Sequence, residues 1–269
     1  MIKNLKLGRL ELIAFVGGSV VMVLELIGAR ILAPYLGNSI FVWTSIIGII
    51  LAALSLGYHL GGRLSAQKPT LQTLAGILLV AGVLITITAI IKTPILELAS
   101  NLGVRGGSVV ATLLLFAPAS VILGMISPYA IRLKITDVES SGGVAGNLYA
   151  ISTIGSIVGT FLAGFVLVPL FGSSQLLYGL SGVLILTSLV GGARALPIVL
   201  LAGVAAASFV GPAPDSNLVY EADSSYNHIR VVDFTDRDNQ DLRALYLATE
   251  THSIIFRDSK EVYAEYHKL

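Results

Sequence analysis

Apolar runs dominate the chain as far as residue 211, and polar or glycine-containing segments separate them. A helix that crosses a bilayer needs about 20 predominantly apolar residues. Seven runs approach that length. The pattern therefore predicts an all-α polytopic membrane bundle of about seven transmembrane helices, with spans near residues 10–34, 40–62, 71–91, 107–133, 144–170, 174–191 and 195–211.

The hydrophobic pattern changes after Pro214. From Tyr226 to Asp233, aromatic and β-branched residues alternate with polar ones, which is the period of a half-buried strand. Two more strand-like runs follow, at 244–247 and 253–256. Three short strands bury too little apolar surface to be stable alone, so we expect them to pack on something else. The sequence thus predicts a membrane domain over 1–212 and a small antiparallel β-hairpin or meander of about three strands within 213–269, closed by a helical turn from Ser259 to Leu269.

The composition supports an integral membrane protein and excludes several other classes. Hydrophobic residues make up 55% of the chain and charged residues 12%, far from a soluble domain. No cysteine is present, so disulfides and thiolate metal sites are excluded. The scattered basic residues argue against nucleic-acid binding, and no phosphate-binding loop or HExxH zinc sequence occurs. A pair formed by His228 and His252 on adjacent strands is a poor basis for a metal site, so we predict none.

Small residues and prolines give some of the spans individual features. Gly57 with Gly61, and Gly155 with Gly159, have the spacing that lets two helix backbones approach closely, and we predict packing faces there. Trp43 is expected to anchor the second span at the outer interface. Prolines 118 and 128 should bend the fourth span, and such bends often line cavities. The apolar stretch 94–104 is too short to span and is expected to form an interfacial helix.

Glu25 and Arg30 are the most informative polar residues, because they fall inside the first predicted span. A charge near the bilayer midplane costs roughly 2.5–3.5 kcal/mol, so both side chains need a compensating environment. One interpretation is that each pairs with a neighbouring helix; the two lie about 140° apart on a helix. The other is a polar cavity for a small charged ligand, to which Asn147 and Tyr149 of the fifth span are further candidates.

Lysines and arginines in short loops predict the orientation of the spans. One set of loops contains Lys3, Lys6, Arg9, Arg63, Lys68, Arg132, Lys134 and Arg194, and the alternate set contains Lys92 and Arg105. Because positive residues concentrate on the cytoplasmic side, the N-terminus is predicted to be cytoplasmic in a cell membrane. Seven spans would then place the C-terminal segment outside, whereas one span fewer, through a miscount around 94–134 or 174–211, would place it in the cytoplasm.

Several segments resemble the membrane-bound spermidine synthase-like family, in the same order and spacing. In the membrane part these are LELIGARILAPYLGNSIFVWTSIIG (24–48), GYHLGGRL (57–64), GMISPYAIRL (124–133) and NLYAISTIGSIVGTFLAGFVLVPLFG (147–172). In the C-terminal part they are DSSYNHIRVVD (223–233), LRALYL (242–247) and THSIIF (251–256), which are similar to the β-hairpin region that precedes the Rossmann-like catalytic domain of spermidine synthases.

The resemblance implies a membrane-anchored polyamine aminopropyltransferase, which moves an aminopropyl group from decarboxylated S-adenosylmethionine to an amine such as putrescine. It also implies that Tyr226, Asn227, His252 and Ser253 occupy the positions of substrate-contacting hairpin residues, although soluble members commonly have glutamine where this chain has Asn227. The family's glycine-rich loop and catalytic aspartate would lie beyond Leu269. The resemblance thus implies a Rossmann-like catalytic domain or subunit as partner, and no catalytic residue within this chain.

Three functions are compatible with these observations. The first is the membrane and hairpin portion of such an aminopropyltransferase, with the catalytic domain truncated or encoded separately. The second is a small transporter or receptor in which Glu25, Arg30 and the bent fourth span line a site for a charged solute such as a polyamine. The third is a structural anchor that recruits a soluble enzyme. The lipid bilayer is a partner in all three, and homo-oligomers are compatible with each.

Overall fold

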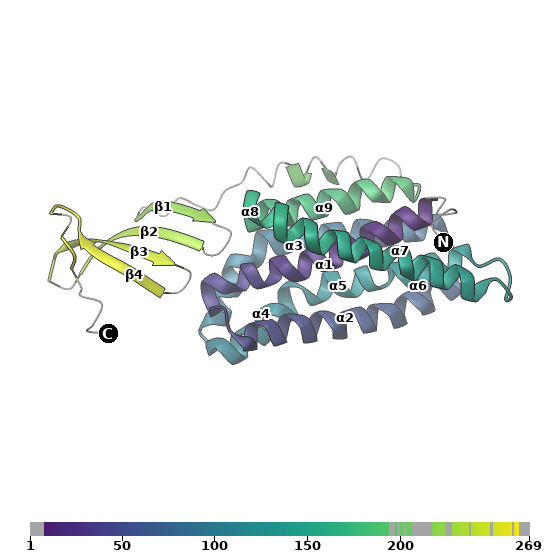
Figure 1. Ribbon diagram of the computed structural model, residues 1–269, viewed down its shortest axis with the longest axis horizontal. Coiled ribbons are helices and arrows are strands. Elements are labelled where there is room, and N and C mark those ends of the chain that lie inside the picture. The colour runs from purple at the N-terminus through teal and green to yellow at the C-terminus, as the bar shows by residue number, and fades with distance from the viewer. Residues whose placement is uncertain are drawn as a thin grey trace.

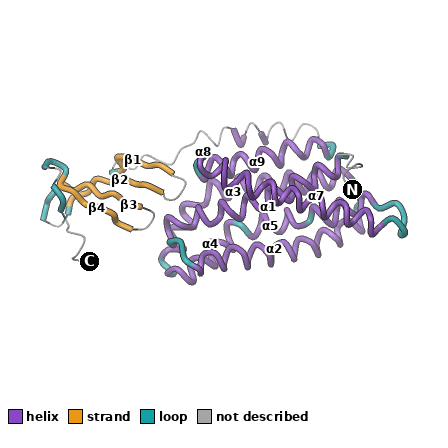
Figure 2. The backbone as a smooth tube through the Cα atoms, in the orientation of Figure 1, coloured by secondary structure: helices purple, strands orange, loops and turns teal. Residues whose placement is uncertain are grey.

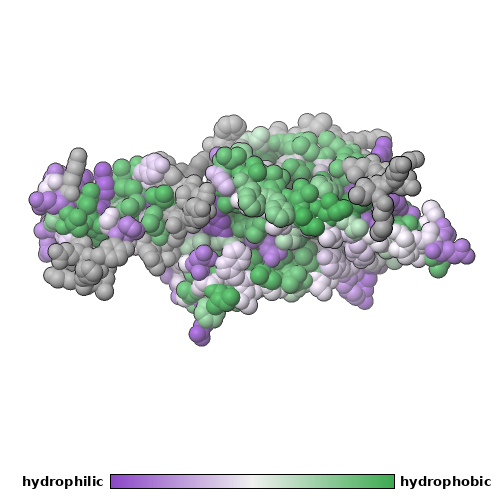
Figure 3. Space-filling view, in the orientation of Figure 1, coloured by the Kyte–Doolittle hydropathy of each residue, from purple (hydrophilic) through white to green (hydrophobic). Residues whose placement is uncertain are grey.

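The protein consists of a long helical bundle and a small β-sheet that lies beyond one end of it (Figures 1 and 2). The computed structural model describes residues 8–193, 197, 200, 201, 203–205, 217–223, 228–236, 238–247, 250–259 and 261–263. The first helix begins at the end of the bundle opposite the sheet, which we call the N-terminal end (Figure 1). Hydrophobic residues cover much of the bundle surface that is seen in Figure 3, as expected for helices that face hydrocarbon.

The multi-pass helical bundle predicted from the sequence is confirmed. Five helices are long and apolar enough to cross a membrane. The segments Gly103–Leu115 and Ala117–Lys134, which are bent by 48° relative to each other, form a sixth span if they are counted together. The predicted number of seven is not confirmed, because most of 195–211 lies outside the described residues. The helices are α1 (Arg9–Leu36), α2 (Ile40–Gln67), α3 (Leu71–Ser100), α4 (Gly103–Leu115), α5 (Ala117–Gly124), α6 (Ile126–Lys134), α7 (Ser141–Leu162), the π-helical η1 (Ala163–Leu167), α8 (Val168–Leu170) and α9 (Ser173–Val190).

The separate interfacial helix predicted at 94–104 is wrong, because α3 continues through Pro94 to Ser100. Leu96 and Ala99 are buried in the core, so the helix keeps its apolar face against the bundle beyond the proline. The Ala99 carbonyl also lies against α4, where a Cβ on Gly107 would come within 2.4 Å of it. Tertiary packing therefore extends this helix further than its hydropathy predicts.

The proline-associated break in the fourth span is confirmed. Pro118 lies in the first turn of α5, and Pro128 lies near the start of α6. The Thr88 hydroxyl of α3 donates a hydrogen bond of 2.7 Å to the Leu115 carbonyl at the end of α4, which satisfies a backbone acceptor at the break.

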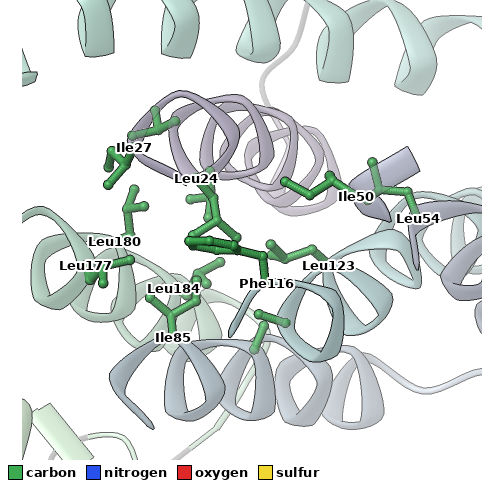
Figure 4. Close-up of a cluster of buried hydrophobic side chains, with 14 of the residues drawn as sticks. Leu24, Ile27, Ile50, Leu54, Ile85, Phe116, Leu123, Leu177, Leu180 and Leu184 are labelled. Carbon is green, nitrogen blue, oxygen red and sulfur yellow. The ribbon is translucent and has the colours of Figure 1, made fainter. Parts of the chain in front are cut away.

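The space beside this break is filled rather than open. Phe116, which separates α4 from α5, is fully buried, and Figure 4 shows its ring among side chains of the central core. The ring also lies 3.5 Å from the position that a Cβ on Gly28 would take. The labelled neighbours in Figure 4 are Leu24, Ile27, Ile50, Leu54, Ile85, Leu123, Leu177, Leu180 and Leu184.

Both predicted glycine pairs form close helix contacts. On α7, a Cβ on Gly155 would lie 2.1 Å from the Phe15 carbonyl of α1, and one on Gly159 would lie 2.6 Å from the Ser19 carbonyl. The Ser19 hydroxyl donates to the Gly155 carbonyl at 2.8 Å. A Cβ on Gly57 or Gly61 of α2 would likewise come too close to backbone atoms of α5 and of Met125. These contacts set the mutual position of the helices.

The C-terminal segment forms a four-stranded antiparallel meander in the order β1-β2-β3-β4. The additional strand is β1, which pairs with β2 and was not among the three that alternation predicts. The strands are β1 (Leu218–Asp223), β2 (His228–Thr235), β3 (Asp241–Leu247) and β4 (Glu250–Phe256).

The closing helical turn predicted from Ser259 is wrong for the residues that are described there. Val262 instead forms an antiparallel bridge with Ile255, and the Tyr263 ring packs edge-on against Phe256 at 5.2 Å. The Tyr263 hydroxyl donates to the Asp236 carboxylate at 2.8 Å. These contacts keep 261–263 extended along β4, while residues 264–269 lie outside the described part.

Candidate functional site

Arg30 interacts with the end of a neighbouring helix. Its Nη1 atom donates hydrogen bonds to the carbonyl oxygens of Val168, at 2.6 Å, and Phe171, at 2.9 Å. Carbonyls at a helix C-terminus have no intrahelical donor and carry partial negative charge. The guanidinium therefore compensates the end of α8, as the structural interpretation of this residue predicts.

Glu25 is half-buried on α1 and makes no hydrogen bond or ion pair with another described residue. A carboxylate in the middle of a membrane span is expected to have a functional or structural partner. The predicted pairing of Glu25 with a neighbouring helix is therefore not observed in the described part of the chain.

Asn147 and Tyr149 do not share a cavity with Glu25. Both are exposed on α7, which runs parallel to α1, with Gly155 beside Phe15 and Gly159 beside Ser19. This register places Tyr149 level with the first turn of α1, sixteen residues before Glu25. At 1.5 Å per residue the separation along the bundle is about 24 Å. Tyr149 instead lies within electrostatic range of Tyr58 on α2.

The candidates on the sheet are only partly described. Tyr226 and Asn227 lie outside the described residues. Ser253 is half-buried and His252 is exposed on β4. The histidine pair expected on adjacent strands is wrong: His228 begins β2, and β3 lies between β2 and β4. Among the described residues, no group of three or more histidines or carboxylates could hold a metal ion.

Ion pairs join neighbouring strands of the sheet. Arg243 forms two hydrogen bonds with Asp233 on the opposite strand, at 2.6 and 2.8 Å. The guanidinium lowers the pKa of the Asp233 carboxyl below its ordinary value of 3.8. Arg257 similarly binds Asp241 at 2.6 Å. Both carboxylates are thus engaged in ion pairs that stabilise the sheet, and we assign them a structural role.

An apolar groove of about 430 Å³ lies between α1, the α7–α8 segment and α9, and sequence analysis did not predict it. Its volume falls in the range of ligand pockets, but its polar groups are engaged: the Ser19 hydroxyl binds backbone carbonyls, and Gln175 Oε1 accepts from the Gly172 amide. It therefore offers little to a charged solute. The groove is lined by Phe15, Val16, Ser19, Val20 and Val23 of α1, by Val158, Gly159, Leu162, Leu167 and Phe171 of the α7–α8 segment, and by Gln175, Leu176, Gly179, Leu180 and Val183 of α9.

Comparisons with known proteins add no assignment to this geometry. No family model matches the chain, and neither the curated proteins nor the solved structures contain a significant match.

Proposed function

We propose that this chain is the membrane and hairpin portion of a spermidine synthase-like polyamine aminopropyltransferase, and that it holds a Rossmann-like catalytic domain or subunit at the membrane. The observation that supports this proposal best is the four-stranded antiparallel meander from Leu218 to Phe256. It occupies the part of the chain that resembles the β-hairpin region preceding the catalytic domain. A meander joined to a membrane bundle is suited to anchoring.

The arrangement of the polar residues in the bundle also favours anchoring over solute transport. Arg30 is bound to the end of α8, and Tyr149 lies about 24 Å along the bundle from Glu25. The described cavity is apolar. A site for a polyamine would need several acceptors to converge on one space, which this arrangement does not provide.

The membrane topology that goes with this proposal has seven spans and a cytoplasmic N-terminus. α9 ends at the N-terminal end of the bundle, whereas the sheet lies beyond the opposite end (Figure 1). One further span would connect these two ends. The apolar composition of 195–211 and the helical state of residues 197, 200, 201 and 203–205 support a seventh span there.

Exposed apolar residues on β1 are the expected contact with the catalytic partner. Tyr220 is 56% exposed on this strand, and Val219 is 48% exposed. Exposed apolar side chains on a small sheet favour association with another domain. We therefore expect the Rossmann-like partner to cover this part of the sheet.

The first experiment is to measure the intact mass of the native product, extracted from its own membranes, together with its aminopropyl transfer from decarboxylated S-adenosylmethionine to putrescine. A species heavier than 28.2 kDa, or a co-purifying Rossmann-like subunit, supports the proposal if it forms spermidine. A native product without such a domain or subunit and without transfer activity overturns it.

A matched pair of variants tests the docking surface. Tyr220→Ser should weaken retention of the catalytic subunit, or lower the activity of a fused enzyme, because it removes an exposed ring from β1. Val138→Ser, at a position 88% exposed in the loop between α6 and α7, is the control and should retain both. Equal behaviour of the two variants would contradict docking through β1.

A transporter or receptor for a charged solute such as a polyamine is the second candidate. The observation that favours it is Glu25, a half-buried carboxylate within α1 that has no hydrogen-bond or ion-pair partner in the described part of the chain. Calorimetry on the Glu25→Gln variant tests this role. Unchanged binding of every charged candidate would remove Glu25 from any such site.

A further inference from the structure

The two ends of the bundle contain different sets of loops. The N-terminal end contains the start of α1, the α2–α3 loop (68–70) and the α6–α7 loop (135–140) (Figure 1). The α1–α2 loop (37–39) and the α8–α9 connection (171–172) lie at the other. The sheet lies beyond this second end (Figure 1).

Positive charge is concentrated at the end that lies away from the sheet. Of the eight lysines and arginines between residues 8 and 193, where the chain is described, five lie at the N-terminal end and three lie toward the end that faces the sheet; in the sequence, Lys3 and Lys6 also precede α1. The three are Arg30, Lys92 and Arg105. Short connections rich in lysine and arginine are retained in the cytoplasm, whereas acidic residues contribute little to orientation.

We infer that the sheet, and the partner that binds it, lie on the exoplasmic side of the membrane. The charge distribution places the N-terminal end of the bundle in the cytoplasm, and the sheet is at the opposite end. The segment 215–269 contains six basic and eleven acidic residues. The first of these basic residues is Arg230, so none lies close to the preceding apolar run, where lysines and arginines set the orientation, and the composition is compatible with export.

This location goes beyond the proposed function, and it rests on that proposal only for the identity of the partner. A cationic donor and an amine do not cross hydrocarbon unaided, because a charged group is costly to place there. A catalytic partner bound to the sheet must therefore receive both substrates on the exoplasmic side. A reaction or transporter that delivers the donor to that side is then required.

The absence of cysteine from the chain allows a direct test with single-cysteine variants. Asp258→Cys places a thiol on the exposed turn after β4, and Val138→Cys places one in the exposed loop at the N-terminal end. A membrane-impermeant maleimide should label Asp258→Cys in intact cells. It should label Val138→Cys several-fold more after permeabilisation. Val262→Cys, also exposed beside β4, is a second probe of the sheet and should behave like Asp258→Cys.

The opposite pattern, with the sheet variants labelled only after permeabilisation, would overturn the inference. The labelling does not depend on enzymatic activity. Failure of aminopropyl transfer would thus reject the proposed function and leave the location of the sheet intact. Reversed labelling would place the sheet in the cytoplasm and leave the proposed function intact.

Discussion

Lys134, in the last turn of α6, donates a hydrogen bond to the buried carboxylate of Glu11, in the first turn of α1. The Glu11 side chain is 6% exposed and that of Lys134 is 33% exposed. The pair joins residues that are far apart in the sequence at the N-terminal end of the bundle. It holds the last segment of the broken span against the first helix.

Replacing Lys134 with methionine should destabilise the bundle. The substitution leaves the Glu11 carboxylate buried without its cation, which costs about 2–3 kcal/mol. Thermal unfolding in detergent should show a lower midpoint for Lys134→Met. Lys68→Met removes an exposed lysine at the same end and is the control, with little expected change. Adding Glu11→Gln to Lys134→Met should recover part of the loss; no recovery would argue against the pair.

A single methyl group at Gly155 should separate α1 from α7. Its Cβ would lie 2.1 Å from the Phe15 carbonyl, and such overpacking typically costs about 1–3 kcal/mol. We expect Gly155→Ala to lower the unfolding midpoint. Gly146→Ala in the same helix meets nothing within 4 Å and should leave stability unchanged or slightly raised. A similar loss in both variants would mean that the close contact between Gly155 and Phe15 is not responsible.

Loss of the Arg30 guanidinium should loosen the end of α8. Arg30→Met removes the donors to Val168 and Phe171, and each charge-assisted hydrogen bond contributes about 1.5–3 kcal/mol. Amide hydrogen exchange around 166–172 should become faster. Arg30→Lys keeps the charge without the planar fork and should show an intermediate effect. Unchanged exchange in Arg30→Met would show that the α8 end does not depend on this contact.

The Asp233–Arg243 pair should make the sheet sensitive to acid. The pKa of Asp233 is lowered in the folded state by the Arg243 hydrogen bonds, so the pair contributes its full stability above the unfolded pKa, near 3.8. That contribution is lost as the pH falls through the lowered folded value. The carboxyl ¹³C shift of Asp233 should titrate below 3.8, and Arg243→Gln should raise the midpoint. A midpoint that does not change in Arg243→Gln would contradict this assignment.

The nature and position of most elements follow from local sequence properties. The free energy of placing an apolar helix in hydrocarbon is nearly the sum of contributions from its residues. Segments such as 9–36 and 40–67 can therefore be predicted as spans without knowing which helices surround them. Alternation in 228–235 likewise indicates a strand. Gly155 and Gly159 indicate a packing face, because a missing Cβ permits close approach wherever the partner comes from.

The partner of each polar group was decided by the tertiary structure. The sequence places Glu25 and Arg30 in one span, but only the parallel register of α1 and α7 separates Glu25 from Tyr149 and brings Arg30 to the end of α8. The strand order, which puts β3 between the two histidine-bearing strands, is also non-local. Hydropathy and its periodicity depend only on residues that are close together in the sequence. They therefore determined which segments form helices and which form strands. Hydrogen bonds require particular atoms within about 3 Å, and that proximity arises only when separate helices and strands pack.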